Sequence, residues 1–165
     1  TQVPSPCTVI PLGAAGGEVT GSAYLLQTPE ARILVDFGLF QGGRRAEEKN
    51  LLPPEVEPAS LDAVLVTHAH LDHVGRLPLL AKAGYAGPIH ATPATLELAR
   101  LILHDSAKVQ QFDIERTNRK RQRAGEPPLE PLYTHADADA VLRLFRPAPY
   151  DTPFSVAPGV EACFA

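Results

Sequence analysis

The first sixty residues alternate short apolar runs with turns that contain glycine or proline. Thr8–Pro11, Gly21–Leu26 and Ile33–Asp36 are each rich in β-branched or large apolar residues. Such runs, separated by short turns, are typical of an antiparallel meander of strands. Leu39–Pro54 lacks this pattern and is expected to form a loop, with a short charged helix around Arg44–Asn50.

From residue 60 onwards, strand-like and helix-like patterns alternate. Ala63–Thr67 is a continuous apolar run, which is typical of a strand buried on both faces. A helix is expected over Gly75–Ala83, a short strand over Pro88–Ala91 and a further helix over Ala136–Phe145. Arg146–Ala165 has the pattern of two strands around a Pro-Gly turn. This order predicts an α/β domain whose sheet is backed by helices.

A long helix is predicted between Thr92 and about Ala124. Thr92 offers a capping hydroxyl, and Pro93 suits the first helical position. Gly125–Pro128 ends the helical pattern. We expect this helix to bury an apolar stripe formed by Leu98, Leu101, Ile102, Val109 and Phe112.

Composition describes an ordinary globular chain with a slightly acidic balance. Of its 165 residues, 44% are hydrophobic and 21% are charged, and the formal net charge is −4. A surface that binds nucleic acid over its whole area would be basic, so any such contact must be local. No apolar run approaches the ~18 residues of a membrane span. Without a signal-peptide pattern as well, a soluble cytoplasmic protein is expected.

The strongest chemical signal is a histidine cluster that follows the buried strand. Three of the six histidines fall within residues 68–73. Side chains two residues apart in extended backbone project to the same side, so His68 and His70 can reach one metal ion together. Asp72 and His73 follow as the chain turns into the next helix and can serve a second ion. Imidazole and carboxylate ligands without a thiolate favour zinc or manganese in a hydrolytic site.

These residue types predict hydrolysis with two divalent cations. Two cations about 3.5–4 Å apart can hold a bridging hydroxide and bind the oxygens of a scissile phosphate or carbonyl group. Asp72 is the candidate catalytic residue, because one carboxylate oxygen can bind metal while the other orients the hydroxide. The alternative is a chance cluster on a solvated loop. Its position at the end of an apolar strand favours a site.

This motif, in this position, resembles the metallo-β-lactamase superfamily. Further stretches are similar to one branch, the β-CASP nucleases, and to its bacterial RNA-processing members. Those stretches are Gly13–Ser22, Val35–Gly42, Leu71–Pro78, Asp105–Ala107 and Glu126–Tyr133. Phe37 stands where the branch usually has cysteine. The resemblance implies the αββα sandwich of that superfamily, with this chain as its N-terminal part.

The resemblance also implies roles for individual residues. Asp36 matches the first-motif aspartate, which braces the histidine loop rather than binding metal. The second-motif ligands match His68, His70, Asp72 and His73. The third-motif histidine, the fourth-motif aspartate and the β-CASP insertion have no counterpart within residues 1–165. We therefore expect residues 1–165 to be the N-terminal portion of a metallo-β-lactamase domain, inactive without the rest of a longer parent protein.

The activity expected of the parent protein is metal-dependent hydrolysis of RNA, by endonucleolytic cleavage, with exonucleolytic cleavage also open. A hydrolase of small thioester or lactone substrates on the same fold is one alternative. A DNA-specific nuclease and a non-catalytic partner subunit are two others. Homodimerisation of the parent protein is a further open expectation.

A basic run near the end of the long helix is a candidate contact for the RNA backbone. Its members are Arg116, Arg119, Lys120, Arg121 and Arg123. The alternative is a solvated helix face, which Glu115 and Glu126 at its flanks support. The remaining histidines, at positions 90, 104 and 135, are scattered and are expected to be structural or exposed rather than ligands.

Overall fold

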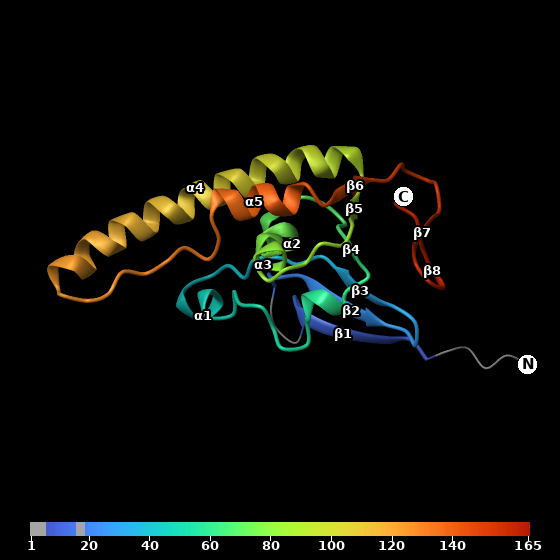
Figure 1. The fold of residues 1–165 in the computed structure, drawn as a ribbon, viewed down its shortest axis with the longest axis horizontal. Coiled ribbons are helices and arrows are strands. Elements are labelled where there is room, and N and C mark those ends of the chain that lie inside the picture. Colours follow the sequence, from blue (N-terminus) through green and yellow to red (C-terminus); the bar gives the residue numbers. More distant parts are fainter. Residues whose placement is uncertain (1–5, 16–18) are drawn as a thin grey trace, which may run out of the picture.

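The computed structural model describes residues 6–15 and 19–165 of the chain. Residues 16–18 belong to the predicted opening turn between Gly13 and Ser22, and this part of the prediction lies outside the described residues. In the described part, an α/β architecture is confirmed, with a central sheet and helices packed against it (Figure 1).

A six-stranded sheet with the order β1-β2-β3-β4-β5-β6 forms the centre of the domain. Its strands are β1 (Thr8–Gly13), β2 (Ala23–Gln27), β3 (Arg32–Val35), β4 (Ala63–Leu65), β5 (Ile89–Ala91) and β6 (Phe145–Pro147). The first three strands pair antiparallel, as the meander pattern predicted, and β3 to β6 pair parallel. Short turns suffice for the antiparallel pairs, whereas each parallel pair needs a longer crossover.

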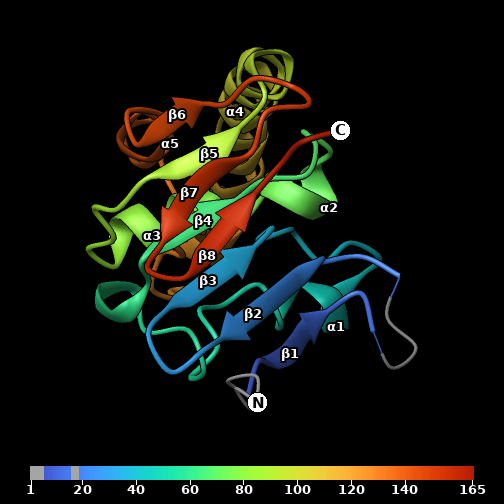
Figure 2. The ribbon, with the colours of Figure 1, turned by 90° about the vertical axis from the view of Figure 1, so that its right-hand side faces the viewer.

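Helices lie on one side of this sheet, and a β-hairpin lies on the other (Figures 1 and 2). The helical segments are α1 (Arg44–Glu47), the 3-10 helix η1 (Pro58–Ser60), α2 (Leu71–Val74), α3 (Leu77–Lys82), α4 (Pro93–Arg123) and α5 (His135–Leu142). The hairpin comprises β7 (Phe154–Ala157) and β8 (Val160–Ala162), which pair antiparallel around the predicted Pro-Gly turn. The two strands predicted for Arg146–Ala165 are therefore accompanied by a third, β6, which joins the central sheet. The helix predicted to reach Phe145 ends earlier, because Phe145 begins the edge strand β6.

The core is built on one row of side chains that crosses five strands. Leu25, Leu34, Val64, Ile89 and Phe145 are neighbours in register, and all five are buried. On the opposite face, Val35, Leu65 and His90 at the carboxyl ends of the strands are partly exposed, and His90 packs against Phe154 of the hairpin. Because strand side chains alternate between faces, a slip of one residue would expose the whole buried row, so the core fixes the register. This register fixes where the carboxyl ends of the parallel strands lie.

The buried face of α4 differs from the predicted stripe. Leu98, Leu101, Val109 and Phe112 are 52–67% exposed. The residues that α4 buries are Thr95, Ala99, Leu103, Ser106 and Ala107. Four of these five residues are small, so the helix lies close to the elements beneath it. Because small residues are only weakly hydrophobic, the sequence pattern did not reveal this face of the helix. Of the five predicted stripe residues, only Ile102 is partly buried against the core, so the prediction was wrong for the other four.

The end of α4 extends well beyond the sheet, and the chain returns from it along a loop (Figure 1). The side chain of Asn118 bonds the backbone N–H and C=O of Leu129. Arg121 forms an ion pair of 2.8 Å with Glu126 and donates to the carbonyl of Pro127. These contacts join the projecting end of the helix to its return loop. Among the described helices, none is long and apolar enough to cross a membrane.

We expect Leu103→Ala to lower the free energy of unfolding by about 2–5 kcal/mol, because it leaves a cavity beneath α4. Leu101→Ala removes the same atoms from an exposed position and is expected to change stability by less than about 0.5 kcal/mol. Urea denaturation followed by circular dichroism measures both values. Similar losses for the two variants would contradict the helix face described here.

Candidate metal centre

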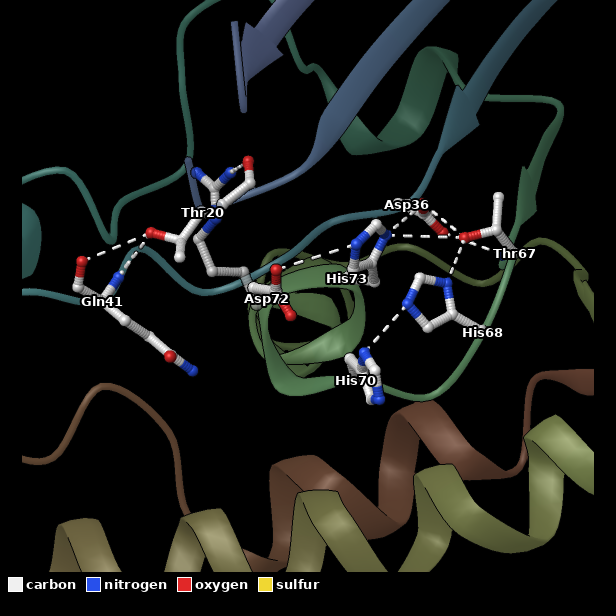
Figure 3. A network of polar contacts seen from close by, with 10 residues as sticks. Thr20, Asp36, Gln41, Thr67, His68, His70, Asp72 and His73 are labelled. Atoms are coloured by element: carbon white, nitrogen blue, oxygen red, sulfur yellow. Dashed lines mark hydrogen bonds and ion pairs between the residues drawn. The ribbon is translucent and has the colours of Figure 1, made fainter. Parts of the chain in front are cut away.

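The histidine cluster lies where the parallel strand β4 ends and α2 begins (Figure 3). The Val66 amide still bonds the His90 carbonyl of the neighbouring strand, so the chain leaves the sheet immediately before the cluster. His70 is the N-cap residue of α2, with extended backbone angles, and Asp72 and His73 follow in the first turn of the helix. The cluster therefore spans a strand end and a helix start, both anchored by backbone hydrogen bonds.

His68 and His70 form one pair of donor atoms. The distance between His68 Nε2 and His70 Nδ1 is 3.1 Å, and both rings are partly accessible. Two ligands of one tetrahedral zinc, each at 2.0–2.1 Å, are about 3.3 Å apart. The two nitrogens therefore lie at a separation that one cation can bridge.

Asp72 and His73 form a second pair beside the first. His73 Nε2 lies 3.7 Å from Asp72 Oδ2, and the ring centroids of His73 and His68 are 3.9 Å apart. Figure 3 shows the three imidazoles and the Asp72 carboxylate gathered on one side of α2. In the described part of the chain, no three His, Cys, Asp or Glu side chains converge closely enough to hold a metal ion as a set. The donors are thus two neighbouring pairs rather than a closed coordination shell.

Asp36 connects the end of β3 to this cluster. Its side chain is 2% exposed, and its φ of 58° is in the left-handed region. The carboxylate accepts hydrogen bonds from the Thr67 amide at 2.8 Å, the Thr67 hydroxyl at 2.8 Å and His73 Nδ1 at 2.7 Å. Asp36 therefore satisfies its buried charge with three donors, all from the segment that carries the cluster.

These hydrogen bonds also determine which imidazole nitrogens carry protons. A carboxylate can only accept, so His73 Nδ1 carries the proton and leaves the Nε2 lone pair free. Because the Thr67 hydroxyl donates to Asp36, its oxygen accepts from His68 Nδ1, 3.0 Å away, so the Nε2 of His68 carries no proton and faces His70 Nδ1 at 3.1 Å. A ring nitrogen bound in this way orients a histidine for metal binding through the other nitrogen. Thr67 was not among the predicted site residues, and its position directly before His68 was the available signal.

Burial and neighbouring imidazoles keep His68 neutral. Desolvation lowers its pKa, and the charges of His73 and His70 lower it further, while Asp36 and Asp72 act in the opposite direction. A neutral imidazole is the form that binds metal. The surroundings of His68 thus favour the form of its imidazole that binds a cation.

Three backbone amides from other segments donate to the carbonyls of α2, and we call these three amides the α2 clamp. The amides of Leu39, Ser22 and Phe37 donate to the carbonyls of Leu71, Asp72 and His73 at 3.0, 2.8 and 2.8 Å. A Cβ at Gly38 would overlap the Asp72 carbonyl, so only glycine fits there. The clamp ties the first turn of α2 to the chain segments after β1 and β3. The sequence showed these segments as glycine-rich turns but not their contact with α2.

The other predicted contacts lie away from this cluster. Four of the five basic residues on α4 are exposed: Arg116, Arg119, Lys120 and Arg123. The fifth, Arg121, is partly buried in its contacts with the return loop. Of the three histidines predicted to be scattered, His90 packs against Phe154, whereas His104 and His135 lie together with ring centroids 4.5 Å apart. His104 also bonds Asp139 at 2.9 Å.

Together these features define an α/β domain with a histidine and aspartate cluster at the carboxyl end of a buried parallel strand. Residues 16–149 match the family described as the metallo-beta-lactamase superfamily. The chain therefore belongs to the metallo-beta-lactamase superfamily, and membership of this superfamily implies divalent metal ions.

Relatives with similar sequences are considerably longer proteins. The chain is 42% identical over 142 residues to "Ribonuclease TTHA0252" of Thermus thermophilus, covering 86% of this chain and 28% of the relative. It is 50% identical over 95 residues to "Transcription termination factor FttA" of Methanosarcina mazei, covering 56% of this chain and 15% of the relative. The chain thus spans less than a third of the length of either relative.

A solved structure with a similar fold is the metallo-beta-lactamase fold protein YhfI from Bacillus subtilis. It has a TM-score of 0.49 and 22% sequence identity, and the match covers 92% of this chain and 48% of YhfI.

We expect Asp36→Asn to shift the proton of His73 from Nδ1 to Nε2 in the metal-free protein. An amide nitrogen at the position of Oδ2 donates, so His73 Nδ1 must then accept. Nitrogen chemical shifts in NMR spectra of imidazole-labelled protein distinguish the two tautomers. Asp72→Asn is the matched control, because Asp72 Oδ2 is too far from His73 Nε2 for a hydrogen bond. A His73 that stays protonated at Nδ1 in Asp36→Asn would refute the assigned network.

Proposed function

We propose that this domain belongs to a cytoplasmic, metal-dependent RNA phosphodiesterase of the β-CASP branch. The observation that carries the proposal is the 42% identity to a protein named ribonuclease over 86% of the chain. A match of that extent necessarily includes residues 68–73, which hold all four candidate donors. Fold membership alone would not identify the substrate, because one fold serves many chemistries.

In this proposal each donor pair contributes to one of two divalent cations, zinc or manganese. His68 Nε2 and His70 Nδ1 hold the first, and Asp72 with His73 Nε2 holds the second. Tetrahedral zinc takes four ligands, so each pair needs further donors from the complete protein or from water. Two bound cations supply Lewis acidity towards a scissile phosphate and activate water at neutral pH.

The protein groups would orient the ligands and the attacking water around that centre. Asp36 and Thr67 bind the Nδ1 sides of His73 and His68, so the Nε2 atoms of both rings would be available to the cations. Asp72 Oδ2 faces His73, so its other carboxylate oxygen can accept a hydrogen bond from the attacking water and orient it towards phosphorus. The α2 clamp holds Asp72 and His73 in place during this step.

Transcription termination is a second candidate role for the same activity. It is favoured by the 50% identity over 95 residues to a protein named transcription termination factor. RNA cleavage and termination are compatible, because a nuclease can act on a nascent transcript. Homodimerisation of the complete polypeptide remains a prediction.

We expect the complete natural polypeptide to cleave 5′-labelled single-stranded RNA and to lose this activity with EDTA. His68→Ala and Asp72→Asn are expected to lower kcat/KM by at least about 100-fold, since even ligand-orienting residues contribute 10- to 100-fold. His135→Ala, at an exposed histidine of α5, is the matched control. Gel electrophoresis of the products measures cleavage and separates endonucleolytic from exonucleolytic patterns. Preferential turnover of DNA, a thioester or a lactone would contradict the RNA assignment.

We also propose that the exposed basic residues of α4 contact RNA phosphates. The four are Arg116, Arg119, Lys120 and Arg123. The partly buried Arg121 is excluded, because its guanidinium already binds Glu126 and the return loop. With a net charge of −4, the chain can attract a polyanion only through such a local group.

The double substitution Arg119→Gln and Lys120→Gln is expected to weaken RNA binding and its salt dependence. Each lost phosphate contact lowers the slope of log K against log salt by about 0.7 for single strands, so the slope should fall by about 1.4. Fluorescence anisotropy with labelled RNA at several salt concentrations measures this slope. Arg100→Gln, also exposed on α4, should leave the slope unchanged. An unchanged slope in the double variant would exclude these residues from the RNA path.

A further inference from the structure

Arg76 is a fully buried arginine directly beside the metal loop. Its side chain is 1% exposed, and it follows the last residues of α2. The guanidinium donates to three backbone carbonyls from separate loops, those of Gly38, Leu51 and Gly21. Its backbone amide donates to Phe37 at 2.8 Å. One side chain thus joins three segments that are far apart in the sequence.

Two aromatic rings enclose the same guanidinium. The Arg76 Cζ atom lies 4.2 Å from the ring centroid of Phe37 and 4.6 Å from that of Phe40. Burial lowers the pKa of Arg76 to about 10, so it remains cationic at neutral pH. A planar guanidinium can stack on rings and donate in several directions at once, whereas a lysine ammonium is a compact point charge. The pocket is shaped for arginine.

The carbonyls that Arg76 binds belong to the α2 clamp segments. Gly38 lies between Phe37 and Leu39, and Gly21 directly precedes Ser22. The amides of Phe37, Leu39 and Ser22 are the three that hold the first turn of α2. The Gly38 amide in turn donates to the Ser22 carbonyl, which links the two segments. Arg76 therefore binds carbonyls in the same segments whose amides bind the backbone of Asp72 and His73.

We propose that Arg76 is a positioning residue for the Asp72–His73 pair, acting through the α2 clamp to set the affinity of the second cation. This inference rests on the proposed two-cation function. The Thr67 hydroxyl holds the ring of His68, and the clamp amides bind the carbonyls of Leu71, Asp72 and His73 but not those of His68 and His70, so the first pair depends less on Arg76. If Arg76 had only a general structural role, its substitution would lower the metal affinity of both donor pairs alike. A positioning role predicts a lower affinity for the Asp72–His73 pair alone.

The test is a metal titration of the complete natural polypeptide, prepared metal-free. Co²⁺ is added, and binding is followed by visible absorption with a competing chelator. Wild type is expected to bind two ions, with His70→Ala and Asp72→Ala as references that identify the two steps. Arg76→Lys keeps the charge but loses the fork of donors, and its Asp72–His73 step should weaken by at least about 10-fold. The His68–His70 step should change by less than threefold.

Leu103→Ala is the matched control, because it removes buried atoms beneath α4 and should leave both affinities unchanged. Equal weakening of both steps in Arg76→Lys, or no weakening, would overturn the role of Arg76 while leaving the two-cation proposal intact. A wild-type protein that binds fewer than two ions would instead overturn the proposed function, and the Arg76 inference with it.

Hydrogen exchange in the wild-type protein gives a second measurement, which applies if Arg76→Lys does not fold. The amides of Ser22, Phe37 and Leu39 should exchange at least about 100-fold more slowly than unprotected amides, because the clamp and Arg76 hold them. Exchange at unprotected rates would show that no clamp exists for Arg76 to support, and would overturn the inference.

Discussion

The buried carboxylate of Asp36 is the interaction on which the candidate metal centre depends. It lies at the end of β3, and all three of its side-chain donors come from Thr67 and His73. Burying a charge is costly unless it is fully hydrogen-bonded, and here the bonding partners are the groups that must be oriented. The same contacts that satisfy Asp36 therefore free the Nε2 atoms of two histidines. One hydrogen-bond network therefore both stabilises the buried charge of Asp36 and orients the imidazoles for metal binding.

A second buried charge, on Arg76, directly follows α2 along the chain. Asp36 acts on side chains, whereas Arg76 acts on the backbone through the loops that contain Gly21 and Gly38. Glycine at position 38 lets the chain approach the Asp72 carbonyl closely enough for neighbouring amides to bind α2. A short helix such as α2 has little stability of its own, so its position must come from such tertiary contacts. This explains why a loop-rich region can hold four donors in fixed places.

The long helix α4 has two structurally different halves. Its first half packs with small residues over α2, α5 and β6, while the second half projects beyond the sheet with its basic residues. The proposed RNA contact lies on this projecting half, where the basic residues contrast with the acidic balance of the chain as a whole. The contacts of Arg121 and Asn118 give the projecting segment a defined shape.

The sequence by itself determined most of the order of strands and helices, the antiparallel start of the sheet and the four clustered candidate donors, but not the edge strand β6. Those features are local: they depend on alternation, turn residues and spacing within a few positions. Only the tertiary structure decided which face of α4 is buried, because the packing surface selects small residues there over the larger Leu98 and Phe112. The roles of Gly38 and Arg76 were likewise invisible in the sequence, and the one signal for Thr67 was its position directly before His68. Each role depends on hydrogen bonds or close contacts with residues 25 to 55 positions away, and no local pattern encodes such contacts.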